Sequence, residues 1–177
     1  MDAKPFIYQI KLYPNPILTT KCEPVLQEEM TDEFKQLVKG IFPLLAGNNG
    51  YALAANQLGI FKRFFVMEGE TDKKLICFNP EIISKKGENK DFEECLSIPT
   101  VSARMTRAET VEFQYRDLNW ELQTKTYSGI EARVIQHELD HLDGMLFITK
   151  LTPANRSMVS SRLHLLEKVS AEAECLK

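Results

Sequence analysis

The segment His137-Glu138-Leu139-Asp140-His141 constrains this chain more than any other stretch. On a helix, histidines four residues apart project from one face, one turn above the other, so both imidazoles reach one metal ion. Glu138 then flanks that face, where its carboxylate reaches an attacking water without binding the metal. The H-E-x-x-H pattern is typical of hydrolytic metal sites. The sequence therefore predicts a catalytic metal helix whose third ligand lies elsewhere.

The bulk composition excludes several classes of protein. A chain of 177 residues with 44% hydrophobic and 27% charged residues predicts one domain, residues 1–177, with a substantial core. The formal net charge of -3 argues against nucleic acid as the main partner. No apolar run is long enough to span a membrane, and the N-terminus does not resemble a signal peptide. We therefore expect a cytoplasmic protein.

The hydrophobic periodicity predicts an α+β fold, with antiparallel or mixed sheets around the metal-binding helix and a further helix near each end. Thr31 is a candidate N-cap, and Pro43 is expected to kink or end, late in its run, the helix that begins after Thr31. The last helix carries an apolar stripe of Met158, Leu163, Leu166 and Val169. The predicted helices cover 32–45, 129–143 and 156–174, and the predicted strands cover 63–67, 75–79, 80–84, 102–110, 111–116 and 120–127.

The third metal ligand has several candidates. An extended H-E-x-x-H-x-x-G-x-x-H pattern is excluded, because Phe147 occupies the position of its third histidine. A downstream glutamate is possible in principle, but the candidates lie on the polar terminal helix and fit surface charges better; they are Glu167, Glu172 and Glu174. Cys95, which lies upstream beside acidic residues, is a reasonable partner for two histidines. A lone cysteine is also often a small core residue, so spacing leaves this choice open.

Three ordered segments of the chain resemble the peptide deformylase family, which is recognised by G-φ-G-φ-A-A-x-Q, E-G-C-L-S and Q-H-E-x-D-H-L-x-G, where φ is apolar. The corresponding segments here are GYALAANQ at 50–57, EECLS at 93–97 and QHELDHLDG at 136–144. The third segment matches at every fixed position. Each of the first two departs at one glycine, which Ala52 and Glu94 replace, so the chain resembles a divergent member.

The resemblance implies a metal-dependent hydrolase that removes the N-formyl group from the N-terminal methionine of nascent polypeptides and releases formate. It implies that Cys95, His137 and His141 bind one divalent metal ion. In this family the ion is ferrous iron in cells, and zinc, nickel or cobalt replaces it in preparations. Only this resemblance selects Cys95 as the third ligand from among the candidates. The alternatives are a deformylase-like enzyme with altered substrate preference and another H-E-x-x-H metallopeptidase.

The resemblance also assigns roles in catalysis. Glu138 is expected to take a proton from the attacking water and return it to the leaving amine. The side-chain amide of Gln57 and the backbone N–H of Leu96 are expected to stabilise the oxyanion. We expect Asp140 to pair with Arg107 behind the ligands. Gln136 and Glu93 are expected to orient ligands or backbone in the same way.

The substrate-binding residues implied by the alignment include two unusual charges. Asp91 and Arg133 occupy positions that are mostly apolar in the family, beside the methionine pocket. We expect Arg133 to pair with Asp91 or Glu94 and to make this pocket polar or partly filled. The alternative is that the charges of Arg133 and Asp91 point to solvent. The full predicted set is Gly50, Tyr51, Ala52, Asp91, Glu94, Arg133 and Val134. Some relatives contact the ribosome through the C-terminal helix, and the mixed charges of residues 156–174 support that partner only weakly.

Overall fold

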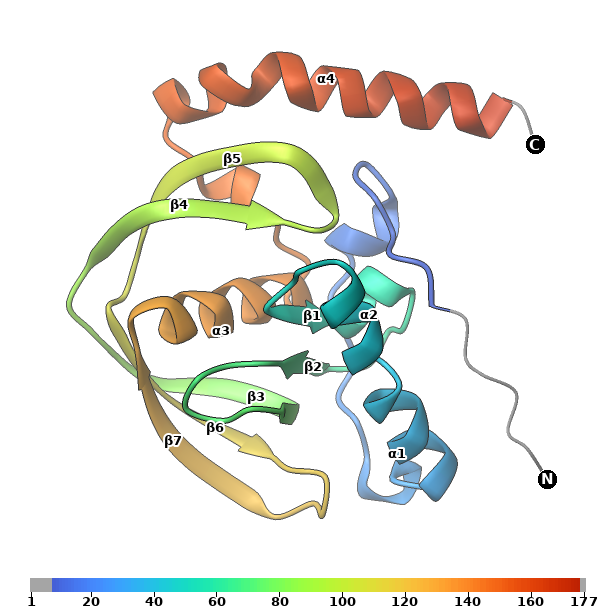
Figure 1. The fold of residues 1–177 in the computed structure, drawn as a ribbon, viewed down its shortest axis with the longest axis vertical. Coiled ribbons are helices and arrows are strands. Elements are labelled where there is room, and N and C mark those ends of the chain that lie inside the picture. The colour runs from blue at the N-terminus through green and yellow to red at the C-terminus, as the bar shows by residue number, and fades with distance from the viewer. Residues whose placement is uncertain (1–7, 176–177) are drawn as a thin grey trace.

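The computed structural model describes residues 8–175, and the side chains of residues 8–172 (Figure 1). The α-helices of this part are α1 (Asp32–Lys39), α2 (Phe42–Gly47), α3 (Gly129–Leu142) and α4 (Pro153–Cys175). The strands are β1 (Ala52–Ala54), β2 (Phe64–Met67), β3 (Leu75–Lys86), β4 (Asn89–Cys95), β5 (Ile98–Arg107), β6 (Thr110–Arg116) and β7 (Leu122–Ser128). Short 3-10 helices are η1 (Pro16–Thr19), η2 (Gln27–Glu29), η3 (Ala55–Leu58) and η4 (Phe147–Lys150).

The strands form two separate antiparallel sheets. One has five strands in the order β1-β2-β3-β6-β7, and the other is the hairpin β4–β5. Helix α3 runs between the two sheets, with the hairpin on one side and the five-stranded sheet on the other (Figure 1). The α+β fold built around the central metal helix is therefore confirmed.

Helix α3 is buried on nearly every side because both sheets cover it. Its apolar face, which includes Ile135, Leu139 and Leu142, packs into a core that contains Phe65 and Phe113 of the five-stranded sheet. Gly144 follows the helix with a φ of 71°, the left-handed conformation that commonly ends helices at glycine. The predicted end of the helix at this glycine is confirmed.

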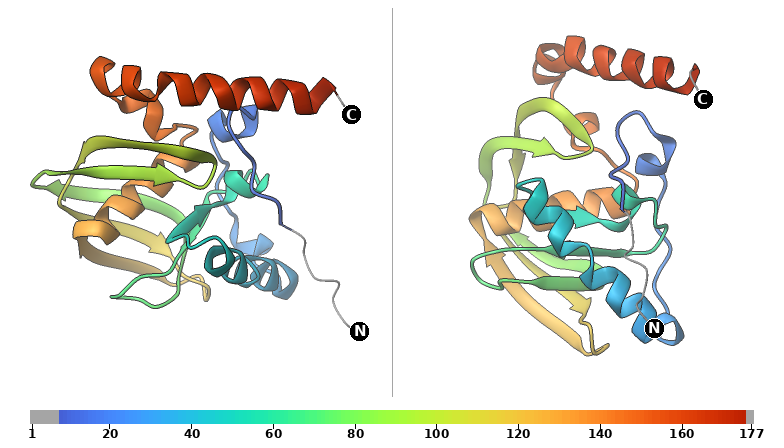
Figure 2. Two further views of the ribbon diagram at one scale, coloured as in Figure 1. Left: turned by 45° about the horizontal axis from the view of Figure 1, so that its top comes forward. Right: turned by 45° about the vertical axis from the view of Figure 1, so that its right-hand side comes forward.

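Strand β2 separates two apolar cores, which explains why all of its residues are buried. Phe65 and Met67 face the core under α3, whereas Phe64 and Val66 face a second core that α1 and α2 cover. The alternation follows from the two-residue repeat of a strand. Figure 2 shows the two short helices beside the sheet, away from α3.

Helix α4 packs across the outer face of β5 and extends past it (Figures 1 and 2). Val159 and Leu163 are its buried contacts with a core that includes Val101 of the hairpin. The predicted apolar stripe of this helix is wrong at Met158, which is 82% exposed, and at Val169, which is 53% exposed. Val159, and not Met158, takes the buried position on this helix. Only part of one face of α4 meets the hairpin.

Other local predictions had mixed outcomes. Thr31 caps α1, where its hydroxyl accepts a hydrogen bond from the backbone N–H of Phe34. Pro43 does not end a helix; it lies in the first turn of α2, where a missing N–H costs nothing. The β6–β7 hairpin is confirmed. The two strands predicted for 75–79 and 80–84 form one strand, β3, which bends through a bulge opposite β6.

Helix α4 and the other helices of the described residues are too short or too polar to cross a membrane. The N-terminal segment on which we based the absence of a signal peptide falls mostly on residues 1–7, outside the described part of the chain.

Candidate metal centre

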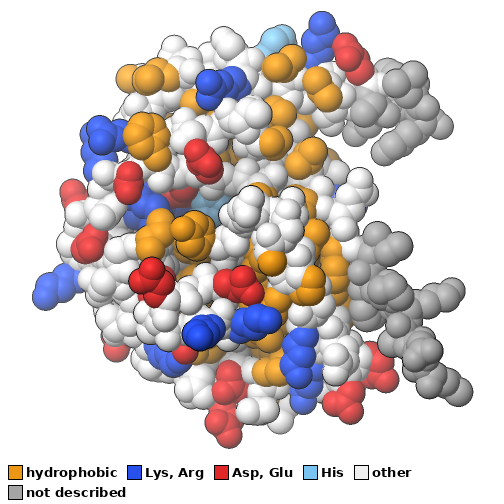
Figure 3. Space-filling view, in the orientation of Figure 1, with side chains coloured by type: hydrophobic (Ala, Val, Ile, Leu, Met, Phe, Trp, Pro, Cys, Tyr) orange, Lys and Arg blue, Asp and Glu red, His pale blue; other side chains and the backbone are white. Residues whose placement is uncertain are grey.

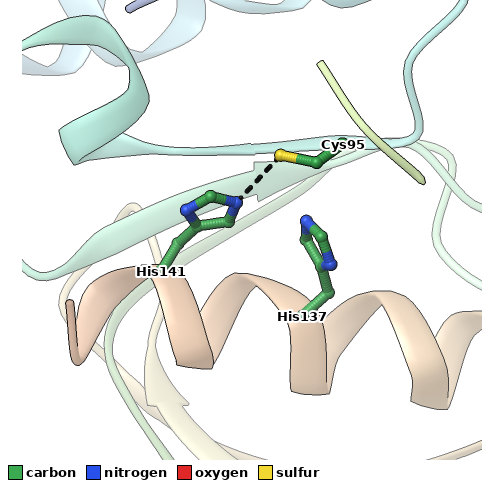
Figure 4. Close-up of side chains that lie close together, drawn as sticks. All are labelled: Cys95, His137 and His141. Carbon is green, nitrogen blue, oxygen red and sulfur yellow. Dashed lines mark hydrogen bonds between the residues drawn. The ribbon is translucent and has the colours of Figure 1, made fainter. Parts of the chain in front are cut away.

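Three side chains that could bind a metal ion converge between α3 and the end of β4 (Figure 4). His137 and His141 lie one turn apart on α3, with ring centroids 4.8 Å apart. The sulfur of Cys95 lies 3.1 Å from Nε2 of His141. One potential ligand atom from each residue lies within 4.8 Å of the other two, and all three residues are buried. Two imidazole nitrogens and one sulfur are a donor set that suits a zinc-like or ferrous ion.

Glu93 fixes the orientation of the His137 ring. Its Oε1 lies 2.6 Å from Nδ1 of His137, so the opposite nitrogen, Nε2, remains for a metal. Burial alone would raise the pKa of Glu93, but hydrogen bonds from His137 and Arg107 outweigh burial and hold that pKa well below its usual range. Glu93 is therefore a buried carboxylate ion that accepts a hydrogen bond from the His137 ring.

Two arginines hold Glu93 in place. Arg107 donates from Nε to Oε2 at 3.0 Å and from Nη2 to Oε1 at 2.5 Å, a bidentate pair. Its Nη1 donates to Asp140 at 2.5 Å. Arg133 adds a donor from Nη1 to Oε2 at 3.1 Å. The predicted Asp140–Arg107 pair is confirmed, and Lys150 also reaches Asp140 at 2.5 Å.

Glu138 lies next to His137 and is 3% exposed. Its Oε2 is buried and has no hydrogen-bond partner among the described residues. Burial raises the pKa of Glu138 to about 7, and the nearby carboxylate of Glu93 adds to this rise. A carboxyl group with this pKa can both accept and return a proton near neutral pH.

Gln57 reaches the same centre from η3. Its Oε1 accepts a hydrogen bond from the backbone N–H of Ala54 at 2.9 Å, which sets the direction of the amide. Its Nε2 donates to Ser97 at 3.0 Å and lies 3.6 Å from the sulfur of Cys95. Leu96, between these two residues, belongs to the tight turn that joins β4 to β5. Gln57 is therefore a buried site residue.

A cavity of about 830 Å³ opens beside Cys95 and His137. In Figure 3 the surface of a histidine is visible inside a hollow, with charged and apolar side chains around it. All the predicted substrate-binding residues line this cavity, together with Gln57, Leu96 and Glu138. Its other walls include Phe92 and Ile130, which are 57% and 52% exposed. The site is thus an open cleft whose walls include Cys95 and His137.

Comparison with known proteins identifies the family. The family model for polypeptide deformylases matches residues 7–157. The chain belongs to the peptide deformylase family. This family consists of metal-dependent hydrolases that remove the N-formyl group from the N-terminal methionine of nascent polypeptides. The resemblance found in the three sequence segments is confirmed.

Curated relatives and solved structures agree with this assignment. The chain is 40% identical over 154 residues to peptide deformylase 2 of Xanthomonas axonopodis pv. citri, covering 85% of this chain and 91% of that one. It is 35% identical over 166 residues to the peptide deformylase of Acidobacterium capsulatum, covering 92% and 96%. The crystal structure of plant peptide deformylase PDF1B superposes with a TM-score of 0.89 at 29% identity, covering 94% and 92%.

The pairing predicted for Arg133 is wrong. Its guanidinium contacts neither Asp91 nor Glu94, and it donates instead to Glu93, Asn89 and the carbonyl oxygen of Met105. Arg133 is only 3% exposed, so its charge needs a buried partner, and Glu93 is the buried carboxylate of β4. Asp91 and Glu94 are exposed to water and need no such partner.

The two departures from the family pattern have different surroundings. Ala52 is 8% exposed and belongs to the core under α3, so its methyl group is partly absorbed by packing. Glu94 is exposed at the cavity, opposite Ser102 of β5. Gly50, a glycine that matches the family pattern, lies close to Leu96. A Cβ added to Gly50 would lie 2.8 Å from Cδ1 of Leu96. Glycine at this position therefore keeps the two segments together.

Several site residues were missed by sequence reasoning. Ser97 and Asn56 lie within the quoted family segments, which could have pointed to them; Ser97 accepts from Gln57, and Asn56 donates to the carbonyl oxygen of His141 at 2.6 Å. Asn89 and Lys150 gave no local signal. Gln136 orients backbone as predicted, since its side chain accepts from the N–H of Ala108 at 3.1 Å and donates to its carbonyl oxygen at 3.0 Å.

Two of the alternative glutamate ligands, Glu167 and Glu172, have partners away from the centre. Glu167 accepts a hydrogen bond from the hydroxyl of Tyr13 at 2.6 Å, and Glu172 lies 4.0 Å from Lys168 on α4. The side chain of Glu174 lies outside the described residues. Neither described glutamate therefore supports the metallopeptidase alternative.

Proposed function

We propose that this chain hydrolyses the formyl-amide bond of N-formylmethionyl peptides with one divalent metal ion held by Cys95, His137 and His141. The observation that carries the proposal is the convergence of three buried donor atoms within 4.8 Å of one another. The adjacent carboxyl group of Glu138 supplies the proton acceptor that hydrolysis requires. We also propose that residues 1–177 form one catalytic domain.

The donor set fits a catalytic metal. Three protein ligands leave one coordination position for water or substrate, and the Nδ1 contact of His137 with Glu93 leaves its Nε2 for the metal. When bound, the metal acidifies a water molecule and polarises the formyl carbonyl group. We propose ferrous iron as the ion in cells, with zinc, nickel or cobalt able to replace it in purified protein. A thiolate ligand makes Cys95 the atom most sensitive to oxidation.

Glu138 is proposed to move the proton. It accepts a proton from the attacking water and then delivers it to the nitrogen of the leaving methionine, so formate and a free amine are released. Its buried Oε2 without a protein partner and its place on the cavity wall support this role. A pKa raised to about 7 by burial balances both halves of the transfer.

Gln57 and Leu96 are proposed to stabilise the negative charge that develops on the formyl oxygen. Gln57 points its Nε2 toward Cys95, and Leu96 follows Cys95 directly, so an amide N–H from each is available near the ligands. Removal of one such donor typically costs about 10²–10³-fold in kcat.

The substrate is proposed to lie along the cleft with its first side chain beside Val134 and Arg133. The terminal nitrogens of Arg133 are committed to Glu93, Asn89 and Met105, so its guanidinium does not offer a free charge to the substrate. This supports methionine as an acceptable first residue. The substrate chain would continue past Gly50, Tyr51 and Ala52 on the opposite rim.

The proposal extends to the cellular setting of the chain. We propose action in the cytoplasm, and membership of the peptide deformylase family supports nascent polypeptides as the substrate. Contact with the ribosome through α4 is supported only by the exposure of that helix, whose Met158 and Val169 lie largely in solvent.

A formate-release assay on protein loaded with nickel or iron tests the proposed function. We expect release from formyl-Met peptides, and a loss of about 10²–10⁴-fold in kcat for Glu138→Ala, the range for removing a general acid–base group. Glu121→Ala, which alters an exposed residue away from the cleft, should retain full activity. A loaded, folded wild-type protein that releases no formate would contradict the proposal.

A further inference from the structure

The proposed ligands come from two elements that no sheet joins. His137 and His141 lie on α3, whereas Cys95 ends β4 of the separate hairpin. In the described structure the two strands of the hairpin pair only with each other, so strand pairing does not set the position of the hairpin on α3. Side chains must therefore fix the distance between the sulfur and the imidazoles.

The carboxylate of Glu93 is the point where hairpin and helix meet. Oε1 contacts His137 at 2.6 Å and Arg107 at 2.5 Å. Oε2 contacts Arg107 at 3.0 Å and Arg133 at 3.1 Å. Each oxygen thus has two partners, which fills the acceptor capacity of a carboxylate. Glu93 cannot rotate without breaking several of these contacts.

Arg133 connects α3 to both strands of the hairpin. Its Nη2 donates at 2.9 Å to the backbone oxygen and at 2.9 Å to the side-chain oxygen of Asn89, which begins β4. Nη1 and Nη2 both approach the carbonyl oxygen of Met105 on β5 at 3.3 Å. The guanidinium is therefore a rigid fork that spans the hairpin from the helix.

Arg107 makes the reciprocal connection. It arises from β5 of the hairpin and reaches across to Asp140 of α3 at 2.5 Å. The two arginines extend in opposite directions and meet at Glu93. Together they hold the hairpin at two separated places, which fixes its orientation on the helix as well as its distance.

We propose that Arg133 is a positioning residue of the metal centre, which acts through Glu93 and the hairpin to hold the Cys95 sulfur against the two histidines. The inference rests on the proposed ligand set. Arg133 touches neither the reacting atoms nor the metal in this role. Arg133 holds the ligand atoms in the arrangement in which they bind the metal ion. Its loss should therefore change the metal coordination even in protein that folds normally.

Cobalt(II) binding to the purified, metal-stripped protein tests this role, because absorption bands of cobalt report thiolate ligation and coordination geometry directly. Arg133→Met keeps the length of the side chain and removes the guanidinium. We expect about 10–100-fold weaker Co²⁺ binding, the usual cost of losing a partner behind the ligands, together with altered bands. Arg104→Met removes a guanidinium from the exposed side of the same hairpin and should change neither property.

A double-mutant cycle separates positioning from simple stabilisation. If Arg133 acts through Glu93, Arg133→Met should weaken Co²⁺ binding much less in a Glu93→Gln background than in the wild type. Unchanged Co²⁺ affinity and bands in folded Arg133→Met protein, with only a lower unfolding temperature, would overturn the proposal. Equal losses in both backgrounds would overturn the route through Glu93.

Asn89→Ala provides a second variant if Arg133→Met does not fold. It removes one acceptor of the guanidinium and leaves the charge, so weaker Co²⁺ binding supports positioning and unchanged binding contradicts it. Cys95→Ser tests the ligand set separately. Co²⁺ bands that do not depend on Cys95 would refute the proposed ligands, whereas a negative result for Arg133 alone leaves them intact.

Discussion

Helix α3 presents two opposite sides that are both buried but are held in different ways. Toward the five-stranded sheet it presents Ile135, Leu139 and Leu142, which pack into the apolar core. Toward the hairpin it presents Arg133 and Asp140, with His137 between them along the helix, and these side chains meet partners through hydrogen bonds and ion pairs.

The comparison separates stability from geometry. Apolar burial adds about 25 cal/mol for each Å² removed from water and has no preferred direction. A buried ion network adds little net stability, since desolvation offsets the attraction, but each contact has a required distance and angle. We infer that the apolar side of α3 stabilises the packing of the helix. The polar side fixes the positions of the proposed metal ligands.

Replacing Cys95 by serine is expected to give the largest effect and to act only on the polar side. The loss of a direct ligand should weaken metal binding by more than the roughly 10–100-fold typical of an outer partner. Unfolding of the metal-stripped protein should hardly change. Metal titration and urea denaturation measure the two quantities. Retained metal affinity would remove Cys95 from the centre.

Ile135→Ala changes only the apolar side of α3. Ile135 is fully buried, and truncation of such a residue costs about 2–5 kcal/mol of unfolding free energy. The remaining folded protein should bind Co²⁺ with unchanged bands. Urea denaturation and cobalt spectra provide the test. A changed spectrum at full folding would mean that the apolar side also sets the ligand geometry.

The pH dependence of stability should reveal Glu138. Its folded-state pKa of about 7 lies above the ordinary value of 4.5, so the native protein retains this proton where the unfolded chain loses it. The resulting stability is complete below pH 4.5 and is lost as pH rises through 7. At about 1.4 kcal/mol per pKa unit, the total is about 3 kcal/mol.

Metal-stripped wild type and Glu138→Gln should be compared by urea denaturation between pH 4.5 and 7.5. The variant should lack this decline because an amide does not titrate. Identical slopes in the two proteins would contradict the assigned pKa of Glu138.

Asp140→Asn should give the smallest of these effects. Asp140 accepts from Arg107 and from Lys150, and hydrogen bonds to charged groups contribute about 1.5–3 kcal/mol. We expect a loss of unfolding free energy in that range, with weaker Co²⁺ binding because Arg107 loses its anchor on α3. Denaturation and cobalt titration measure both. No change in either would remove Asp140 from the network.

The sequence predicts local features of this fold well. The spacing of His137 and His141 places them on one face of a helix, and the cap at Thr31 depends only on neighbouring residues. The end of α3 at Gly144 is equally local. Each of these follows from a short stretch of chain, so no knowledge of the surrounding structure is required.

Features that depend on how elements meet could not be predicted in the same way. Arg133 was expected beside Asp91 or Glu94, and its choice of Glu93 depends on which hairpin residue is buried against α3. The exposure of Met158 depends on the line along which α4 meets β5. Cys95 was one of several ligand candidates on spacing alone, and only the family resemblance singled it out as the third ligand.

The separation of the hairpin from the five-stranded sheet has a consequence for motion. Amides in the buried part of α3 should exchange with solvent only when much of the molecule opens, whereas a two-stranded element can open by itself at lower free energy. Such an opening withdraws Cys95 and leaves His137 and His141 in place. We therefore expect hydrogen exchange in β4 and β5 to slow on metal binding far more than exchange in α3.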